Sequence, residues 1–442
     1  MSKVYIETLG CPRNQADSDI CAGLVRDGGF ELVSSPDEAW CIIVNTCGFI
    51  EDAVNESIEV ILSLSELKIT GHCKCLIVAG CLSQRFQNEL AEEMPEVDFF
   101  IGTAAYFQIP SILKKYNQGK KNGRLIFPAV DSTPLYDSSF PKIISTYPFA
   151  YLKIAEGCAR RCSYCIIPGL RGALRSRLPE DILKEAILMA ESGIKEIVLV
   201  AQETTDYGKD FGGGINLSFL LEKISSSLPD VWIRFMYGHP LSINDNLLET
   251  VNKNKNICPY FDIPVQHASD KILKRMKRFY DLAFLKKLVL NIRSKVEDSV
   301  LRTTIITGFP GEKDDDFKKI LDFLEEVGFD HAGVFTYSEM EDIPSFQLKE
   351  KVESDLAENR RIILMEKQAM ISQKKNFDRC GKVFPVLIEN RDSDDFYSGR
   401  TMFQAPEVDG ITYVDSKNLT PGDIVKVFIT DSFDYDLAGN PI

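Results

Sequence analysis

The chain has 442 residues, 44% of them hydrophobic and 26% charged, which is typical of a soluble globular protein with two or three domains. No apolar run reaches the roughly 20 residues that a membrane span needs. Its first residues do not form a basic segment followed by an apolar one, so we expect no signal peptide. The twelve cysteines are then expected to be reduced and to serve as ligands rather than in disulfides, in a cytoplasmic protein with no membrane partner. The net charge of −14 disfavours general nucleic-acid binding, which needs Lys and Arg, and favours a basic protein partner.

The segment from residue 1 to about 125 is predicted to be an α/β domain with a parallel sheet, because strand-like and helix-like stretches alternate. The helix-like stretches are Ser18–Asp27 and Glu51–Leu64. Each of three apolar, strand-like runs ends in a cysteine: Val4–Cys11, Cys41–Cys47 and Cys75–Cys81.

Cys11, Cys47 and Cys81 are therefore expected at the carboxyl ends of strands, where such sheets bind ligands. Three equivalent positions can converge on one point, and we expect them to hold an iron–sulfur cluster with one iron open. The alternative is three unrelated core cysteines, since Cys is often buried. Recurrence at one topological place favours the cluster. No such order relates the remaining cysteines outside the central motif: Cys21, Cys41, Cys73, Cys75, Cys258 and Cys380.

Residues from about 103 to 147 are predicted to be a joining region. Gln118–Gly123 is polar, and Val130–Pro148 is rich in Ser, Thr and Pro. This composition indicates a turn that ends a helix, followed by a linker.

A CxxxCxxC motif follows, formed by Cys158, Cys162 and Cys165. The apolar run Phe149–Ala155 before it is strand-like, so the cysteines are expected on a loop that leaves a strand. Three thiolates can bind three irons of a 4Fe–4S cluster and leave the fourth iron open. Zinc is the alternative, but zinc usually takes four protein ligands and no fourth Cys or His lies nearby. The motif resembles that of the radical S-adenosylmethionine (SAM) enzymes, in which SAM binds the open iron and is cleaved to a 5′-deoxyadenosyl radical.

The central segment, about 145–372, repeats strand-then-helix units and is predicted to be a partial (βα)6 barrel of the TIM-like kind, with its chemistry at the carboxyl ends of the strands. Helices are expected over Asp181–Ser192 and Asp315–Val327. Besides the strand before Cys158, the predicted strands are Glu196–Gln202, Trp232–Tyr237, Tyr260–Val265, Val300–Ile306 and His331–Tyr337.

Four residues in this segment are candidates to bind SAM. The resemblance to radical SAM enzymes implies that the loop after the second strand meets the SAM amino group, which places Gln202 and Glu203 there. Arg302 on the fifth strand would meet the carboxylate or ribose of SAM, and Gly308 would allow close backbone approach. A structural role in the barrel is the alternative for each of them.

Two basic features are not assigned to the site. His267 is left out because a lone histidine is more often structural than catalytic. The cluster Arg171–Arg177 is interpreted as a solvated face rather than as a contact for an acidic substrate group.

Residues 373–442 are predicted to form a small antiparallel β-barrel of the oligonucleotide-binding type. A last helical stretch, Asn359–Lys375, precedes the barrel. From residue 376 onward there are 12 acidic and 6 basic residues, which would repel a phosphate backbone and attract a protein rich in Lys and Arg. The β-rich runs, separated by turns, are Val383–Ile388, Phe396–Arg400, Ile411–Val414 and Asp423–Thr430.

Motifs along the chain resemble the methylthiotransferases, which are radical SAM enzymes with two clusters that insert a methylthio group into a C–H bond. The N-terminal motifs are Cys11–Asp19, Asn45–Ile50 and Gly80–Arg85, and the last segment is similar to the TRAM domain that closes these enzymes. The resemblance implies that the three N-terminal cysteines hold an auxiliary 4Fe–4S cluster, whose open iron carries the sulfur to be transferred.

One branch of that family modifies an adenosine of tRNA, and another modifies an aspartate side chain of a ribosomal protein. The acidic last segment favours the second branch. The resemblance thus implies a methylthiotransferase that acts at the β-carbon of an aspartate in a small-subunit ribosomal protein, with tRNA as the less favoured substrate. Four further motifs are similar to this branch: Val200–Thr205, Gly399–Thr401, Ala405–Gly410 and Asp434–Gly439.

Such chemistry requires cofactors, because the β C–H bond of aspartate is not acidic enough for base catalysis. We therefore expect two 4Fe–4S clusters, SAM, a sulfur donor and a flavodoxin- or ferredoxin-like electron donor, and we assign no catalytic acid or base. One SAM would methylate the sulfur and a second would be cleaved to the radical. Two alternatives stay open: a tRNA adenosine methylthiotransferase, and a non-catalytic iron–sulfur or zinc protein that binds the ribosome.

Overall fold

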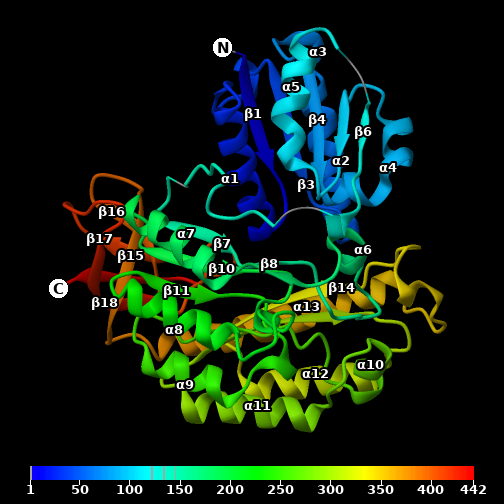
Figure 1. Ribbon diagram of the computed structural model, residues 1–442. Coiled ribbons are helices and arrows are strands. Elements are labelled where there is room, and N and C mark those ends of the chain that lie inside the picture. Colours follow the sequence, from blue (N-terminus) through cyan, green and yellow to red (C-terminus); the bar gives the residue numbers. More distant parts are fainter. Residues whose placement is uncertain (1, 121–122, 133–134, 145) are drawn as a thin grey trace. The chain divides into compact units, whose positions relative to one another are not determined.

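The computed structural model describes residues 2–120, 123–132, 135–144 and 146–442. The chain forms two compact units (Figure 1): the first is Met1–Ile144, Lys153–Arg161 and Cys165–Ile182, and the second is Ser145–Leu152, Cys162–Tyr164 and Leu183–Ile442. The division into domains 1–125, 145–372 and 373–442 stays a prediction. Within these described ranges, no helix is both long and apolar enough to cross a membrane.

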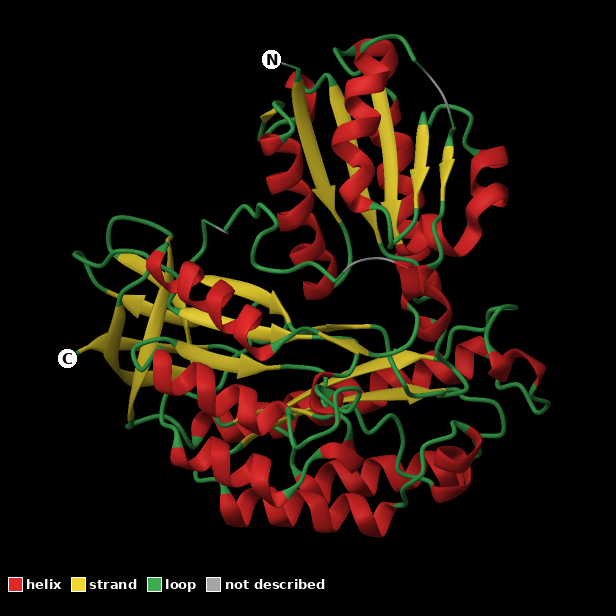
Figure 2. Cartoon of the chain, viewed as in Figure 1, coloured by secondary structure: helices red, strands yellow, loops and turns green. Residues whose placement is uncertain are grey.

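A six-stranded parallel sheet forms the centre of the first unit, with the strand order β2-β1-β3-β4-β5-β6. β3 and β4 are buried along their whole length, as their continuous apolar runs predict. Figure 2 shows the strand arrows pointing the same way, and the predicted parallel sheet is confirmed. The strands are β1 (Lys3–Thr8), β2 (Glu31–Leu32), β3 (Cys41–Thr46), β4 (Cys75–Gly80), β5 (Phe99–Ile101) and β6 (Leu125–Ile126).

Helices cover both faces of this sheet. Ile20 of α1 and Ile112 of α5 belong to the core on one face, and Ile61 of α2 and Leu90 of α4 belong to the core on the other. α1 begins with Pro12 in its first turn, where a missing N–H costs no hydrogen bond. The helices are α1 (Pro12–Asp27), α2 (Glu51–Ser65), α3 (Leu67–Thr70), α4 (Cys81–Glu93) and α5 (Ile109–Asn117).

The joining region is more ordered than the predicted linker. α5 and β6 both lie in it, and β6 pairs with β5 as an edge strand of the sheet. α5 ends at Asn117, directly before the predicted helix-ending turn at Gln118–Gly123. β6 is not predicted, because two residues are too few for a periodic signal. Parts of the predicted turn and linker, residues 121–122, 133–134 and 145, lie outside the described residues.

Six strands of the second unit match the six predicted for the central segment. They form two three-stranded sheets, β11-β10-β7 and β12-β13-β14, in which the pairs β10–β11, β12–β13 and β13–β14 are parallel. Backbone hydrogen bonds from Ile233 of β11 to Asn256 and Cys258, just before β12, connect the two sheets. The strands are β7 (Phe149–Lys153), β10 (Glu196–Val200), β11 (Trp232–Phe235), β12 (Tyr260–Asp262), β13 (Val300–Thr307) and β14 (His331–Thr336).

Helices alternate with these strands, which confirms the predicted strand-then-helix repeat. Figure 1 shows α9 packed beside α8 and α11 along the strands. These helices are α7 (Pro179–Glu191), α8 (Leu217–Ser227), α9 (Asp245–Lys253), α10 (Asp270–Arg275), α11 (Leu282–Lys295), α12 (Asp314–Val327) and α13 (Ser354–Phe377). The short helix α6 (Ile167–Arg171) and the antiparallel pair β8 (Ala155–Glu156) and β9 (Arg175–Ser176) belong to the first unit.

The last segment is a closed five-stranded barrel in the order β15-β16-β17-β19-β18, which confirms the predicted small β-barrel. Two details differ from the prediction: β19 is an additional strand, and it pairs in parallel with β17. β19 includes Gly439, Asn440 and Pro441, which are poor strand formers, so propensity does not reveal it. The strands are β15 (Val383–Arg391), β16 (Phe396–Thr401), β17 (Thr412–Asp415), β18 (Ile424–Ser432) and β19 (Leu437–Pro441).

A buried ion network within the second unit connects this barrel to the central strands. Glu196 at the start of β10 bonds Arg234 of β11 through Oε1 (2.6 Å to Nε) and Arg400 of β16 through Oε2 (2.5 Å to Nη2). Arg400 also donates from Nε to Glu389 of β15 at 2.9 Å. Glu196, Arg234 and Arg400 are at most 1% exposed.

Candidate active site

Three cysteines of the first unit follow the carboxyl ends of neighbouring strands. Cys11 lies between β1 and α1, Cys47 directly follows β3, and Cys81 begins α4 directly after β4. β2 and β3 lie on opposite sides of β1, so the strand order reverses between β1 and β3, and open α/β sheets bind ligands at such a switch point. The predicted placement of these cysteines is confirmed, whereas their role as cluster ligands stays a prediction.

Glycines beside the cysteines allow the three loops to approach closely. A Cβ atom on Gly10 would lie 2.6 Å from Cβ and 3.1 Å from Sγ of Cys47, and Gly10 has a φ of +91°. A Cβ atom on Gly48 would lie 2.8 Å from the backbone of Leu82. Only a residue without a side chain fits at either position. The loop after β1 therefore touches the loop after β3, which touches the start of α4.

Buried amide side chains hold the ends of β1 and β3 together. Asn14 on α1 donates from Nδ2 to the carbonyl oxygens of Leu9 (2.9 Å) and Thr46 (3.0 Å). Asn45 on β3 donates to the carbonyl of Asn14 at 2.9 Å and accepts a hydrogen bond from the Tyr106 hydroxyl at 2.8 Å. The cysteine loops are thus positioned by hydrogen bonds that are shielded from water.

The charges around the three thiols differ. Burial raises the pKa of Cys11, but the charge of Arg13, its hydrogen bond to Sγ (3.4 Å) and the charge of Arg171 bring the pKa below its ordinary value. Burial and the neighbouring thiols of Cys81 and Cys11 raise the pKa of Cys47 to about 11. Burial also raises the pKa of Cys81, although Arg171 opposes it. Neighbouring thiolates repel one another, and a bound cation relieves that repulsion, so the three thiols fit an iron cluster.

Arg171 of α6 connects these loops to a buried carboxylate. Its Nη1 lies 2.7 Å from Oδ2 of Asp17, and its Nη2 lies 3.0 Å from Oδ1 of Asn14 and 3.3 Å from Sγ of Cys81. Asp17 also forms an ion pair with Lys153. The guanidinium therefore contacts a cysteine of the candidate cluster site while a carboxylate holds it in place.

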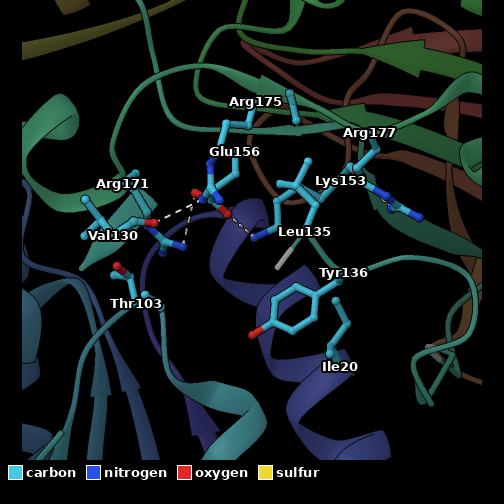
Figure 3. Close-up of a pocket in the computed structure, with 12 residues that line it drawn as sticks. Ile20, Thr103, Val130, Leu135, Tyr136, Lys153, Glu156, Arg171, Arg175 and Arg177 are labelled. Atoms are coloured by element: carbon cyan, nitrogen blue, oxygen red, sulfur yellow. Dashed lines mark hydrogen bonds and ion pairs between the residues drawn. The ribbon is translucent and has the colours of Figure 1, made fainter. Parts of the chain in front are cut away.

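The interpretation of Arg171–Arg177 as a solvated face is wrong. Arg171 and Arg177 are 3% and 6% exposed, and each has a carboxylate partner, Asp17 for Arg171 and Asp181 for Arg177. Figure 3 shows both arginines, together with Lys153, among the residues that line one pocket of the first unit. Ion pairing allows these basic residues to be buried.

The CxxxCxxC motif lies on the loop between β8 and α6, so the prediction that it follows a strand is confirmed. In the first unit, Sγ of Cys158 accepts a hydrogen bond from the backbone N–H of Arg160 at 3.4 Å, and Cys165 is partly exposed. In the second unit, Sγ of Cys162 accepts a hydrogen bond from Nη1 of Arg278 at 3.6 Å. Hydrogen bonds to ligand sulfur atoms are one means by which proteins tune iron–sulfur clusters, and these environments fit a cluster.

All twelve cysteines lie within the described residues, and none of them forms a disulfide bond. Among the residues that the structure describes, no three His, Cys, Asp or Glu side chains are arranged to hold a single metal ion. A 4Fe–4S cluster makes a different demand, because each thiolate binds its own iron at a separate corner of the cube. Three cysteines on loops that touch, with Arg13 donating to Cys11 and Arg171 to Cys81, meet that demand.

Gln202 and Glu203 follow β10 at the carboxyl end of a central strand. Glu203 is 6% exposed and accepts a hydrogen bond from the Thr205 hydroxyl. The same hydroxyl oxygen accepts a hydrogen bond from the backbone N–H of His239 at 2.9 Å, which fixes this loop to the one after β11. A carboxylate held in this way can accept hydrogen bonds from an ammonium group. Binding of SAM by Gln202 and Glu203 stays a prediction.

Arg302 is the third of the eight residues of β13, away from the carboxyl end of the strand. Its Nη1 lies 3.1 Å from Oδ1 of Asp262, and its Nε lies 3.5 Å from Oδ1 of Asp409 in the last segment. Burial alone would lower the pKa of Arg302, but Asp262, Tyr260 and Asp409 raise it. The guanidinium is thus engaged by two carboxylates, and its contact with SAM stays a prediction.

Gly308 directly follows β13 with a φ of +75°, and a Cβ atom there would collide with Ala357 of α13. Its backbone N–H donates to Oε2 of Glu312 at 3.0 Å, and Nε2 of His267 lies 3.2 Å from the same oxygen. Nδ1 of His267 accepts two backbone hydrogen bonds, so Nε2 carries the hydrogen and donates a hydrogen bond to Glu312. Packing and hydrogen bonding account for both residues, and contact of Gly308 with SAM stays a prediction.

Two arginines at the cysteines are not among the residues that the sequence suggests for the site. Arg171 and Cys81 are 90 residues apart, and Arg278 and Cys162 are 116 residues apart, so no local spacing reveals either contact. One indirect signal exists for Arg171. Asn14 and Asp17 are three positions apart on α1 and share a helix face directly after Cys11, and such a polar stripe on a sheet-covering helix indicates a buried polar site.

Three family models match the chain. Residues 3–102 match the Uncharacterized protein family UPF0004, residues 152–324 match the Radical SAM superfamily, and residues 380–442 match the TRAM domain. The three matches fall, in the same order, in the sheet of the first unit, the central strands and the barrel.

Curated relatives align over the whole chain. A protein of Clostridioides difficile (strain 630), named "Ribosomal protein uS12 methylthiotransferase RimO", is 46% identical over 442 residues, which is 100% of this chain and 99% of the relative. A protein of the same name from Desulfosudis oleivorans is 45% identical over 440 residues, which is 99% of both chains. Another from Geotalea uraniireducens is 44% identical over 440 residues, which is 99% of this chain and 98% of the relative.

Solved structures share the fold at low sequence identity. The radical S-adenosylmethionine methyltransferase TsrM from Kitasatospora setae, with cobalamin and a [4Fe-4S] cluster bound, aligns with a TM-score of 0.59 at 13% identity, over 90% of this chain and 81% of that one. The cobalamin-dependent S-adenosylmethionine radical enzyme OxsB aligns with a TM-score of 0.51 at 14% identity, over 85% of this chain and 56% of that one.

Proposed function

The chain belongs to the family of ribosomal protein uS12 methylthiotransferases named RimO, and on that premise we propose that it inserts a methylthio group at the β-carbon of an aspartate side chain in the small-subunit ribosomal protein uS12. The observation that carries the proposal is the meeting of the loops that bear Cys11, Cys47 and Cys81, in a chain that also has a CxxxCxxC loop. A radical SAM enzyme with one cluster does not require a second set of converging thiols. An enzyme that inserts sulfur requires them, to hold the cluster that carries the sulfur.

Six cysteines would hold two 4Fe–4S clusters, with Cys158, Cys162 and Cys165 at the cluster that binds SAM and Cys11, Cys47 and Cys81 at the auxiliary one. When bound, these groups supply an organic radical and a transferable sulfur, which no side chain can supply. The chain's own residues bind and orient them.

Glu203 has the best support as a SAM contact, because its buried carboxylate lies at a strand end and suits an ammonium group. Gln202 beside it and the backbone at Gly308 are further proposed contacts. Arg302 completes the proposed set and would contact SAM only by giving up part of its pairing with Asp262 or Asp409.

The charge of the last segment supports a protein substrate rather than tRNA. From residue 376 onward, its 12 acidic and 6 basic residues attract a basic ribosomal protein and repel a phosphate backbone. We propose that the enzyme acts in the cytoplasm, where thiols stay reduced, and that it depends on a flavodoxin- or ferredoxin-like electron donor and on a sulfur donor.

Iron and sulfide analysis after anaerobic reconstitution tests the two-cluster arrangement. We expect about eight irons per chain for the unaltered protein, and about four after replacing either cysteine triplet with alanine. The variant without Cys11, Cys47 and Cys81 should still cleave SAM but insert no sulfur. Cys380→Ala, at a partly exposed cysteine outside both triplets, is the control and should keep about eight irons. Sulfur insertion by the N-terminal triple variant would refute the auxiliary cluster.

Mass analysis of purified uS12 and of tRNA, each incubated with enzyme, SAM and reductant, identifies the substrate. We expect a methylthio group on an aspartate of uS12 and none on tRNA. A methylthio-adenosine in tRNA with unmodified uS12 would assign the chain to the tRNA branch instead. Product formed without SAM or without reductant would contradict a radical mechanism.

A further inference from the structure

We propose that Arg171 sets the reduction potential of the auxiliary cluster by donating a charge-assisted hydrogen bond to the Cys81 ligand. This inference rests on the proposed function, because it assumes that Cys11, Cys47 and Cys81 hold a cluster. Arg171 lies outside the cysteine motifs, and its proposed role is to position and tune the cluster rather than to act as a catalytic residue.

The contact itself is direct and buried. Nη2 of Arg171 lies 3.3 Å from Sγ of Cys81, and the two residues are 3% and 7% exposed. A guanidinium stays charged at any physiological pH, so the donor at this sulfur is always a cation. Because the site excludes water, the interaction between this cation and the sulfur is stronger than it would be in solvent.

A set of paired charges holds the guanidinium in its position. Nη1 of Arg171 bonds Oδ2 of Asp17 at 2.7 Å, and Asp17 also pairs with Lys153, whose Nζ lies 2.6 Å from Oε2 of Glu156. Figure 3 shows Lys153, Glu156 and Arg171 together in the wall of the pocket. Nη1 of Arg171 also lies 3.5 Å from Oε1 of Glu156, so two carboxylates balance the two cations Arg171 and Lys153. Both carboxylates contact Nη1, and the Nη2 end of the guanidinium is left to bond Asn14 and Cys81.

The direction of the effect follows from the charge of the cluster. Reduction adds an electron, and a fixed cation that donates to a ligand sulfur stabilises the more negative state. Arg171 therefore raises the reduction potential of the auxiliary cluster. Arg171 lies on α6, which begins just after Cys165 in the chain, so the segment that carries one set of cluster ligands also supplies the tuning group for the other.

The test uses full-length protein in which Cys158, Cys162 and Cys165 are replaced by alanine, so that only the auxiliary cluster is present. Its midpoint potential is measured by a redox titration followed by electron paramagnetic resonance, with iron per chain as the loading control. We expect Arg171→Gln to shift the potential to a more negative value at unchanged iron content. Arg177→Gln is the matched control, because Arg177 is a buried, ion-paired arginine of the same segment, and it should leave the potential where it was.

A potential that stays the same in a fully loaded Arg171→Gln variant overturns the inference. If that variant loads no cluster, Arg171→Lys carries the test, since lysine keeps the charge but its single ammonium cannot bond both Asp17 and Cys81 as the guanidinium fork does. We expect a smaller shift in the same direction, and an unshifted potential in the loaded lysine variant overturns the inference as well. Absence of iron from the parent protein, before any change at Arg171, would contradict the proposed function instead.

Discussion

Glu203 offers the sharpest test of the SAM site at the scale of a single residue. Its carboxylate is buried and fixed by the Thr205 hydroxyl, so Glu203→Gln removes a charge with little change of shape. A hydrogen bond to a charged group contributes about 1.5–3 kcal/mol, and we expect the dissociation constant of SAM to rise roughly ten- to hundredfold. Anaerobic equilibrium dialysis measures it, with iron content expected to be unchanged.

Arg302→Met is the comparison for that measurement. Arg302 pairs with Asp262 and Asp409. We therefore expect this variant to lower the free energy of unfolding by more than it weakens the free energy of SAM binding. A Glu203→Gln variant that binds SAM as tightly as the unaltered protein would remove Glu203 from the site.

Single residues could be predicted from the sequence where the signal is local. Cys158, Cys162 and Cys165 form one short motif, and Cys11, Cys47 and Cys81 each end an apolar run, so their placement in the fold was correct. Arg171 could not be found in this way, because its contact with Cys81 spans 90 residues. Its burial also depends on Asp17 and Lys153 from two other elements, which no window of sequence contains.

At the scale of elements, the close approach of the cysteine loops predicts a selective effect of Gly10→Ala. The new Cβ atom would lie 2.6 Å from Cβ of Cys47, which pushes two ligand loops apart. We expect the auxiliary cluster to be lost and about four irons per chain to remain. Iron analysis and SAM cleavage, which should persist, report this outcome.

Gly29→Ala separates the collision from backbone strain. Gly29 has a similar φ of +88°, but a Cβ atom there meets nothing within 4 Å. We therefore expect the Gly29→Ala variant to keep both clusters at a small cost in stability. Equal iron loss in the two variants would show that strain, rather than contact between the loops, is responsible.

The elements that the sequence predicted correctly are those with long apolar runs or clear periodicity. β3 and β4 are continuous buried runs, and α12 carries buried residues at helical spacing. β6 has two residues, and β19 contains Gly, Asn and Pro, so local propensity opposes the pairing that the sheet or barrel imposes. These two strands form because they pair with strands elsewhere in the fold, and that pairing cannot be read from one sequence.

At the scale of the whole molecule, the ion network of Glu196, Arg234 and Arg400 predicts how stability depends on pH. Burial alone would raise the pKa of Glu196, but Arg234 and Arg400 bring it below its ordinary value. A carboxylate with a lowered pKa stabilises the folded state fully above the pKa of the unfolded chain, about 4.3, and loses this contribution as the pH falls through the folded pKa. Burial raises the pKa of Glu389 in spite of Arg400. The contribution of Glu389 to stability therefore grows, rather than shrinks, as the pH falls.

Glu196→Gln should therefore cost about 3–5 kcal/mol at pH 7, since it leaves the buried Arg234 without its carboxylate and leaves Arg400 with Glu389 alone. Glu389→Gln is the matched variant in the same network and should cost less. Urea unfolding at pH 7 and again below about pH 4 measures both, and the penalty of Glu196→Gln should shrink at the lower pH. A penalty that is the same at both pH values would mean that Glu196 is not ionised in the folded protein.

The same network also has a consequence for the time at which the protein can finish folding. Glu196 and Arg400 are 204 residues apart, and β19, which completes the barrel, lies further along still. At translation rates of about 5–20 residues per second, roughly 10–40 s pass between the synthesis of the carboxylate and that of its second arginine. During that interval the Glu196 carboxylate has only Arg234 of its two arginines, and solvent or a chaperone has to satisfy its other oxygen until translation has passed the barrel.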